Sequence, residues 1–171
     1  MKQFNSETQM KTEQQLKQQI RNWISVFIIF LILSGITAFP LEWELSMLVD
    51  VTQNAPVYLK NWILLIHTAL KETNSNYPFM AYGTDWLAFA HVVIAVAFIG
   101  PLRDPVRNIW VIQFGMIACA LIFPLAFICG PIRHIPFYWQ LIDCSFGVFG
   151  FIPLYFCYKK ILLLEKLNQN L

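Results

Sequence analysis

Two ionisable side chains stand inside apolar stretches of the sequence and are the first candidates for chemistry. Asp143 lies within residues 137–158, and His91 lies within residues 86–102. An ionisable group at the centre of a membrane helix costs about 2.5–3.5 kcal/mol on insertion scales, so its presence needs a structural or functional reason. A carboxylate beside an imidazole favours the charged ring or fixes the tautomer of a neutral one. The two residues therefore predict an acid–imidazole pair between helices.

The predicted depths of the two residues agree with such a pair. His91 follows Trp86 by five residues, and Asp143 follows Trp139 by four. At about 1.5 Å per helical residue, both side chains are expected roughly 6–8 Å below the level of these tryptophans. Small residues let helices approach closely in lipid, and Gln140, Asp143, Gly147 and Gly150 recur at helical spacing on one face. The candidate polar site comprises Asp143, His91, Gln140, Arg133, His134 and Asp85.

This candidate site has three interpretations. In the favoured one, His91 and Asp143 form a hydrogen-bonded pair that holds the helices together. In the second, they line an outward-facing polar pocket for a small ligand, a proton or a quinone headgroup. In the third, the histidines bind haem or another metal, which is the weakest interpretation because no two histidines share an apolar stretch. No cofactor or metal is therefore predicted.

The cysteines offer no redox centre. Cys119, Cys129, Cys144 and Cys157 form no C-x-x-C pair, so neither a zinc ribbon nor a dithiol centre is encoded locally. The absence of a C-x-x-C pair disfavours a membrane disulfide oxidoreductase. The four residues are expected to be small apolar packing residues.

The composition of the chain indicates that these apolar segments lie in lipid. The chain has 171 residues, of which 57% are hydrophobic and only 13% charged. Soluble domains have about 45–50% apolar and about 25% charged residues. This composition excludes a cytosolic enzyme, a disordered tail and a secreted disulfide scaffold, and no basic run indicates nucleic-acid binding. We expect an all-α integral membrane protein.

Four segments are long and apolar enough to cross a bilayer core, which needs about 17–25 helical residues. They are residues 23–39, 86–102, 109–130 and 137–158. Trp23, Trp86, Trp110 and Trp139 stand at or near their starts, where indole rings settle at headgroup level. The connections between the last three segments are short, so an up-down four-helix bundle is expected. Residues 1–22 and 159–171 are then tails outside the membrane.

The connection between the first two spans, residues 40–85, is the only large one. Within it, residues 55–72 place apolar side chains at helical spacing, which predicts an amphipathic helix. Such a helix lies in the membrane interface or caps the bundle. A fifth short span is the rival interpretation, and Lys60 and His67 argue against it.

The distribution of basic residues predicts the orientation. Nine of the 12 lysines and arginines fall in the two tails and in the turn between spans two and three. The positive-inside rule therefore places both termini in the cytoplasm of an inner (plasma) membrane.

The turn at residues 103–108 contains Arg103, Asp104 and Arg107, which are expected to contact lipid headgroups or a cytoplasmic partner. Gly100-Pro101 and Gly130-Pro131 precede the second and third connections. Glycine accepts a left-handed conformation and proline cannot continue a helix, so both pairs are predicted to end helices.

Two classes of function follow. The favoured one is a non-catalytic assembly, accessory or structural subunit, with the lipid bilayer, other membrane subunits or a second copy of the chain as partners. The alternative is a membrane protein with an outward-facing pocket around His91 and Asp143.

Overall fold

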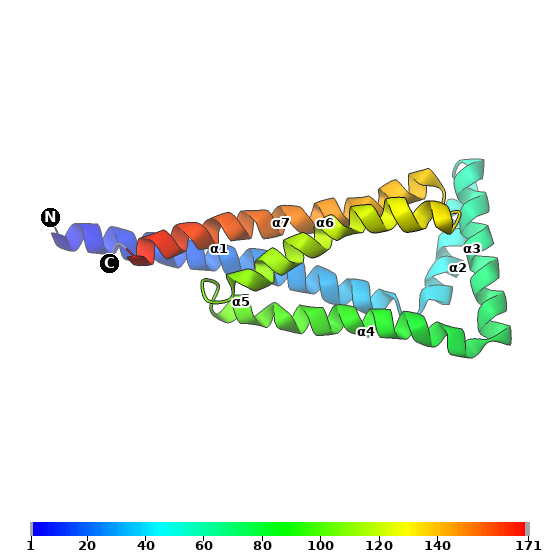
Figure 1. The fold of residues 1–171 in the computed structure, drawn as a ribbon, viewed down its shortest axis with the longest axis horizontal. Coiled ribbons are helices and arrows are strands. Elements are labelled where there is room, and N and C mark those ends of the chain that lie inside the picture. Colours follow the sequence, from blue (N-terminus) through cyan, green and yellow to red (C-terminus); the bar gives the residue numbers. More distant parts are fainter. Residues whose placement is uncertain (1, 170–171) are drawn as a thin grey trace. The chain divides into compact units, whose positions relative to one another are not determined.

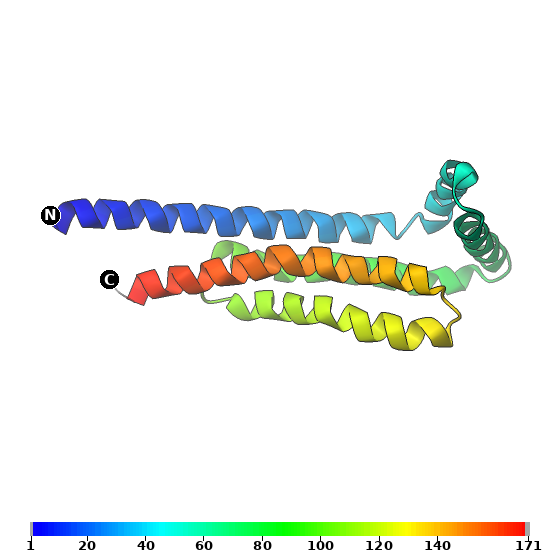
Figure 2. The ribbon, with the colours of Figure 1, turned by 90° about the horizontal axis from the view of Figure 1, so that it is seen from above.

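The computed structural model describes residues 2–169, with side chains from residue 10 onward, and that part of the chain is helical without a strand. Figures 1 and 2 show the ribbon. The α-helices are α1 (Lys2–Thr37), α2 (Leu41–Val51), α3 (Val57–Asn76), α4 (Tyr82–Ala97), α5 (Ile99–Arg103), α6 (Ile109–Ile132) and α7 (Phe137–Gln169). Two short 3-10 helices, Thr52–Asn54 and Pro78–Ala81, flank α3. The expectation of an all-helical chain is confirmed.

Four helical segments are long and apolar enough to cross a membrane, as expected from the sequence. They are Met10–Thr37, Pro78–Arg103, Ile109–Ile132 and Phe137–Gln169. Large apolar side chains remain exposed along all four, among them Phe30, Val96, Ile117 and Phe149. Surfaces of this kind are suited to lipid, since water would penalise them.

The helices extend beyond the spans expected from the sequence. The segment expected as an N-terminal tail is helical from Lys2, and α7 continues beyond residue 158 to Gln169. The reason is that an apolar stripe continues into the charged ends: Leu16 and Ile20 on α1, and Ile161 on α7, are buried. Within the second span, helix α4 begins at Tyr82, four residues before the expected start at residue 86, and ends at Ala97 before the short α5.

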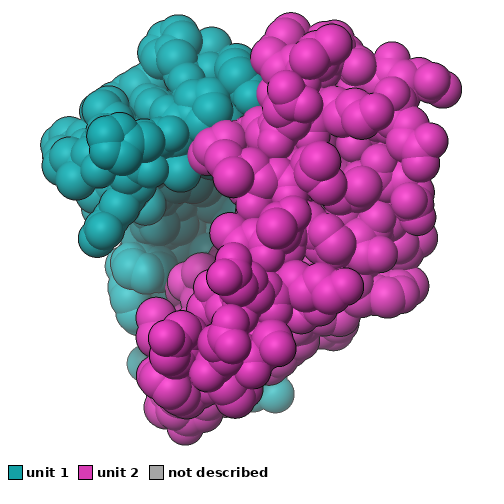
Figure 3. Space-filling model, turned by 90° about the vertical axis from the view of Figure 1, so that its right-hand side faces the viewer, with its two compact units in different colours: residues 1–29, 96–171 teal, residues 30–95 magenta. Residues whose placement is uncertain are grey.

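The chain divides into two compact units, coloured in Figure 3. Met1–Ile29 and Val96–Leu171 form the first unit, and Phe30–Ala95 form the second. Helix α1 therefore contributes its first part to one unit and its last turns to the other, and each unit is described separately below.

In the first unit, α6 and α7 run antiparallel and pack closely (Figures 1 and 2). Glycines make this approach possible. A Cβ on Gly147 would lie 2.7 Å from the backbone oxygen of Cys119, and one on Gly115 would lie 2.8 Å from Leu154. Cys119, Cys144 and Cys157 are buried and Cys129 is exposed, with all four thiols free.

The first part of α1 packs against α7 in the same unit. Lys160 donates a hydrogen bond to the Gln19 side-chain oxygen at 2.6 Å, and the rings of Trp23 and Phe156 stack with centroids 6.1 Å apart. Residue numbers rise along α1 as they fall along α7, so the two helices are antiparallel. The buried Ile20, on α1, belongs to this contact face.

The second unit contains α2 and α3, which pack against each other, together with residues 30–37 of α1 and most of α4. The close approach in this unit is at Gly35. A Cβ there would lie 2.8 Å from the backbone oxygen of Ala88 and 3.0 Å from Cβ of His91. Helix α3 occupies most of the segment expected to be an amphipathic helix, whereas α2 was not expected.

The two glycine–proline pairs do not end helices, contrary to the expectation above. Gly130 and Pro131 lie inside α6, and Gly100 and Pro101 lie inside α5. The left-handed residue is His134, with φ 56°, and no described glycine has positive φ. The Ile135 N–H bonds the Gly130 carbonyl at 2.9 Å and the His134 N–H bonds that of Pro131 at 3.1 Å, which is a Schellman motif. The glycines serve close packing instead.

Candidate functional site

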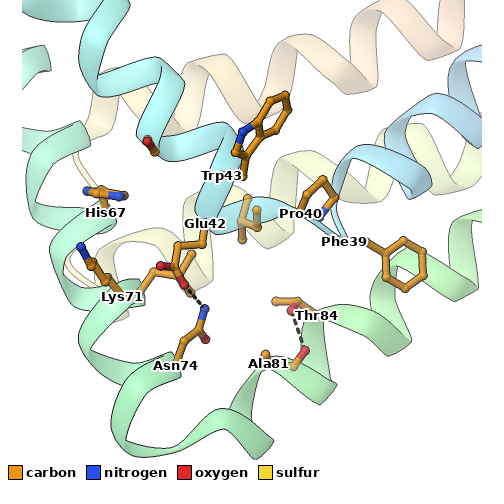
Figure 4. A pocket seen from close by; sticks show the side chains of 12 residues that line it. Phe39, Pro40, Glu42, Trp43, His67, Lys71, Asn74, Ala81 and Thr84 are labelled. Atoms are coloured by element: carbon orange, nitrogen blue, oxygen red, sulfur yellow. Dashed lines mark hydrogen bonds between the residues drawn. The ribbon is translucent and has the colours of Figure 1, made fainter.

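A pocket of about 490 Å³ lies within the second unit, between α2, α3 and the start of α4 (Figure 4). We call it the α2–α3 pocket. Its lining residues are Phe39, Pro40, Leu41, Glu42, Trp43, Ser46, His67, Leu70, Lys71, Asn74, Ala81 and Thr84. The volume falls within the range of about 300–1,000 Å³ that is typical of small-molecule sites.

One face of α3 supplies three polar side chains to the pocket. His67, Lys71 and Asn74 are spaced by four and three residues, which places them on the same side of a helix. Figure 4 shows them on the side of α3 that looks towards Glu42. The regular helical spacing of α3 is therefore what brings an imidazole, an ammonium and an amide to one wall.

Helix α2 supplies the facing carboxylate. Pro40 precedes the helix, and its carbonyl accepts the Glu44 N–H at 3.0 Å, so the first turn is set immediately after α1 ends. Glu42 lies in that first turn. A negative side chain is favoured there by the helix dipole, by about 0.3–1 kcal/mol at an exposed position.

The polar groups of the pocket are partly satisfied by one another. Asn74 Nδ2 donates a hydrogen bond to Glu42 Oε2 at 2.8 Å. The other amide atom, Asn74 Oδ1, is closed to solvent and has no hydrogen-bond partner in the described part of the chain. Lys71 forms no ion pair within residues 10–169, although it lines the same cavity as Glu42. A carboxylate and an ammonium thus share the pocket without neutralising each other.

Most of the remaining lining residues are apolar. Phe39 and Trp43 are largely exposed beside the pocket, and Leu70 adds an aliphatic wall. The Thr84 hydroxyl donates a hydrogen bond to the Ala81 carbonyl at 2.6 Å, so its proton is already used within the same segment of the chain. The site therefore offers a few polar groups on an apolar wall, an arrangement that binds and orients a small molecule.

Among the residues expected to form the polar site, Gln140 is the most deeply buried. Its side chain is 4% exposed, and its Nε2 donates to the Ile135 carbonyl at 2.8 Å. It lies against Gly130, where a Cβ would approach its Cδ to 2.6 Å. Gln140, on α7, therefore contacts both the end of α6 and the turn that follows it.

His91 and Asp143 lie in different units, so their pairing stays a prediction. Both side chains are half-buried. The His91 Nδ1 hydrogen-bonds the Leu87 carbonyl at 2.8 Å, which requires a proton on Nδ1. No described residue of the first unit hydrogen-bonds the Asp143 carboxylate or forms an ion pair with it.

The remaining expected site residues are at helix ends. Arg133 and His134 are exposed after α6, and Asp85 is half-buried in the first turn of α4. Arg103, Asp104 and Arg107 are exposed in the turn before α6. There the Asp104 carboxylate accepts the Arg107 backbone N–H at 3.1 Å, which stabilises the turn.

The pocket residues Glu42, Lys71 and Asn74 were not expected from the sequence. The available signal was the i, i+4, i+7 spacing of His67, Lys71 and Asn74, a polar stripe that runs beside the apolar stripe of the same helix. His67 alone was considered, as an interfacial residue. Glu42, the hydrogen-bond partner of Asn74, is on another helix, and no local spacing connects it to the residues of α3.

Among the described residues, no group of three or more histidines, cysteines, aspartates or glutamates is placed to hold a metal ion. Comparisons with known proteins found no matching family model, no similar curated protein and no similar solved structure.

Proposed function

We propose that the chain is a small, non-catalytic accessory protein of a bacterial-type inner membrane, and that it holds a polar or amphiphilic small ligand in the α2–α3 pocket. The observation that carries the proposal is the pair of opposite charges, Glu42 and Lys71, in one cavity without an ion pair between them in the described structure. Charges kept apart in a concave site are available to a ligand, and complementary charges fix its orientation.

Membrane insertion is the first part of this proposal. It is supported by the four apolar helical segments and by the apolar side chains exposed along them. The proposed arrangement is an up-down bundle, consistent with the antiparallel contacts of α7 with α6 and with α1 in the first unit. The basic residues favour cytoplasmic termini. In that orientation the α2–α3 pocket is on the outer side of the membrane.

Insertion and orientation can be tested in vesicles. After alkaline carbonate washing the protein should remain in the pellet. Single cysteines placed in a cysteine-free variant at Asn108 and at Ser75 should then react with a membrane-impermeant maleimide from opposite sides of the membrane. A chain released by carbonate, or equal labelling of both positions in sealed right-side-out cells, would contradict the proposed insertion and orientation.

Ligand binding is tested by what remains on the purified protein in mild detergent. Native mass spectrometry should show a bound small molecule or lipid on the wild-type chain. Glu42→Gln and Lys71→Met should each reduce its occupancy several-fold. The matched controls Glu44→Gln and Lys60→Met change the same residue types on the same helices, outside the pocket lining, and should retain the ligand. Equal retention by all four variants would rule out the α2–α3 pocket as the binding site.

A further inference from the structure

The charges of the α2–α3 pocket also restrict the kind of ligand, and this inference rests on the proposed function. The lining contains one carboxylate, Glu42, and one ammonium, Lys71. An anionic ligand would satisfy Lys71 but face the Glu42 carboxylate, and a cationic ligand would do the reverse. A ligand that carries both charges satisfies both groups, and discrimination against the singly charged ligands follows from the repulsion they meet.

The surroundings of Glu42 favour a primary ammonium at the positive end of the ligand. Oε2 is held by the Asn74 amide at 2.8 Å, which fixes the carboxylate and leaves Oε1 as an acceptor. In Figure 4 the carboxylate lies beside Asn74, whereas the rings of Trp43 and Phe39 point away from it. Quaternary ammonium groups have no N–H donors and are bound by aromatic cages. A carboxylate without such a cage suits a group that donates hydrogen bonds.

The surroundings of Lys71 favour a phosphate at the negative end. His67 lies one helical turn before Lys71 on the same face of α3, so an ammonium and an imidazole line the same side of the pocket. Together they offer several N–H donors, which match the oxygens of a phosphate group. Trp43 and Phe39, both more than half exposed, provide an apolar border next to the end of α1.

We infer that the α2–α3 pocket binds a phosphoethanolamine group, with its ammonium on Glu42 and its phosphate on Lys71 and His67. This chemistry occurs as a phospholipid headgroup and as free phosphoethanolamine. The pocket lies at the ends of two helices that we propose to span the membrane, and its apolar border continues towards them, so both sources can reach it.

The experiment compares lipids with identical acyl chains on the full-length protein in detergent. Phosphatidylethanolamine, phosphatidylcholine and phosphatidylglycerol are titrated and followed by native mass spectrometry and by the shift in Tm. We expect phosphatidylethanolamine to bind about tenfold more tightly than either of the other two. Glu42→Gln should bring its affinity to within about twofold of phosphatidylcholine, and Lys71→Met should weaken all three lipids. Glu44→Gln and Lys60→Met serve as controls.

Each outcome has a defined meaning. Tighter binding of phosphatidylglycerol or phosphatidylcholine overturns the inferred phosphoethanolamine chemistry, while the proposed ligand pocket stands if the Glu42 or Lys71 variants still alter that binding. No effect of these variants on any ligand overturns the proposed function as well. Free phosphoethanolamine is added as a competitor of the bound lipid. If it displaces the lipid at equal concentration, the soluble compound is a sufficient ligand. If it does not, the acyl chains are part of recognition.

Discussion

The Gln140 side chain fills the space that a side chain at position 130 would occupy. The Gln140 Cδ atom lies 2.6 Å from where a Cβ on Gly130 would be, and its Nε2 donates to the Ile135 carbonyl at 2.8 Å. The glycine is therefore required by the residue that packs on it, and not by its own backbone conformation, because its φ is negative. One buried amide thus joins the end of α6 to the start of α7.

Gly130→Ala should destabilise the protein because the buried Gln140 must move and its bond to Ile135 must lengthen. The expected loss is about 1–3 kcal/mol, the usual cost of overpacking a well-filled site. It can be measured as a change in the free energy of unfolding in detergent. Gly83→Ala is the matched control, since nothing lies within 4 Å of its Cβ position. That control should be neutral or stabilising by up to about 1 kcal/mol, because alanine is the better helix former. Equal effects of the two substitutions would contradict this account of Gly130.

Gly147→Ala should be at least as costly, for a different reason. Its Cβ would lie 2.7 Å from the backbone oxygen of Cys119, and a backbone atom cannot rotate away as a side chain can. The whole of α7 would have to move from α6, at a cost of about 1–3 kcal/mol or more. A lowered Tm together with faster maleimide labelling of the buried Cys119 would report this separation. An unchanged labelling rate would show that the helices do not pack as described.

His134→Gly should stabilise the protein. The residue has φ 56° and occupies the position of a Schellman motif that is usually filled by glycine. The left-handed conformation costs a residue with a Cβ about 1–2 kcal/mol, of which glycine recovers part. A gain of about 0.5–1 kcal/mol is expected in the free energy of unfolding. His134→Ala retains the strain and should give no gain, so a similar gain from alanine would indicate that the imidazole itself was unfavourable.

The predicted pair of His91 and Asp143 can be tested by a double-mutant cycle. If the two side chains hydrogen-bond, His91→Ala and Asp143→Ala should each lower the Tm, and the double variant should lose less than their sum. The coupling expected for residues in contact is about 0.5–3 kcal/mol. Since the His91 Nδ1 is bound to Leu87, the bond to Asp143 would use Nε2. Additive effects would show that the two residues act independently.

The amino-acid sequence by itself determined the all-helical class of this protein and its four long apolar helices. A charged fraction of only 13% and four long apolar stretches leave few alternatives, because both are properties of chain composition and require no knowledge of which helix meets which. The helix ends were less predictable. Gly130-Pro131 carries the usual local signals of termination, yet α6 continues to Ile132 and the left-handed residue is His134, while Gly130 leaves room for the Gln140 side chain.

Only the tertiary structure decided where polar groups of distant segments meet. Glu42 and Asn74 are 32 residues apart and come together because α2 and α3 fold against each other within the second unit. Helical spacing reveals which residues of one helix share a face, but it contains no information about the helix opposite. For this reason the sequence indicated His91 and Asp143, two unusual residues in apolar stretches, and did not indicate a pocket made of ordinary polar residues in a connecting segment.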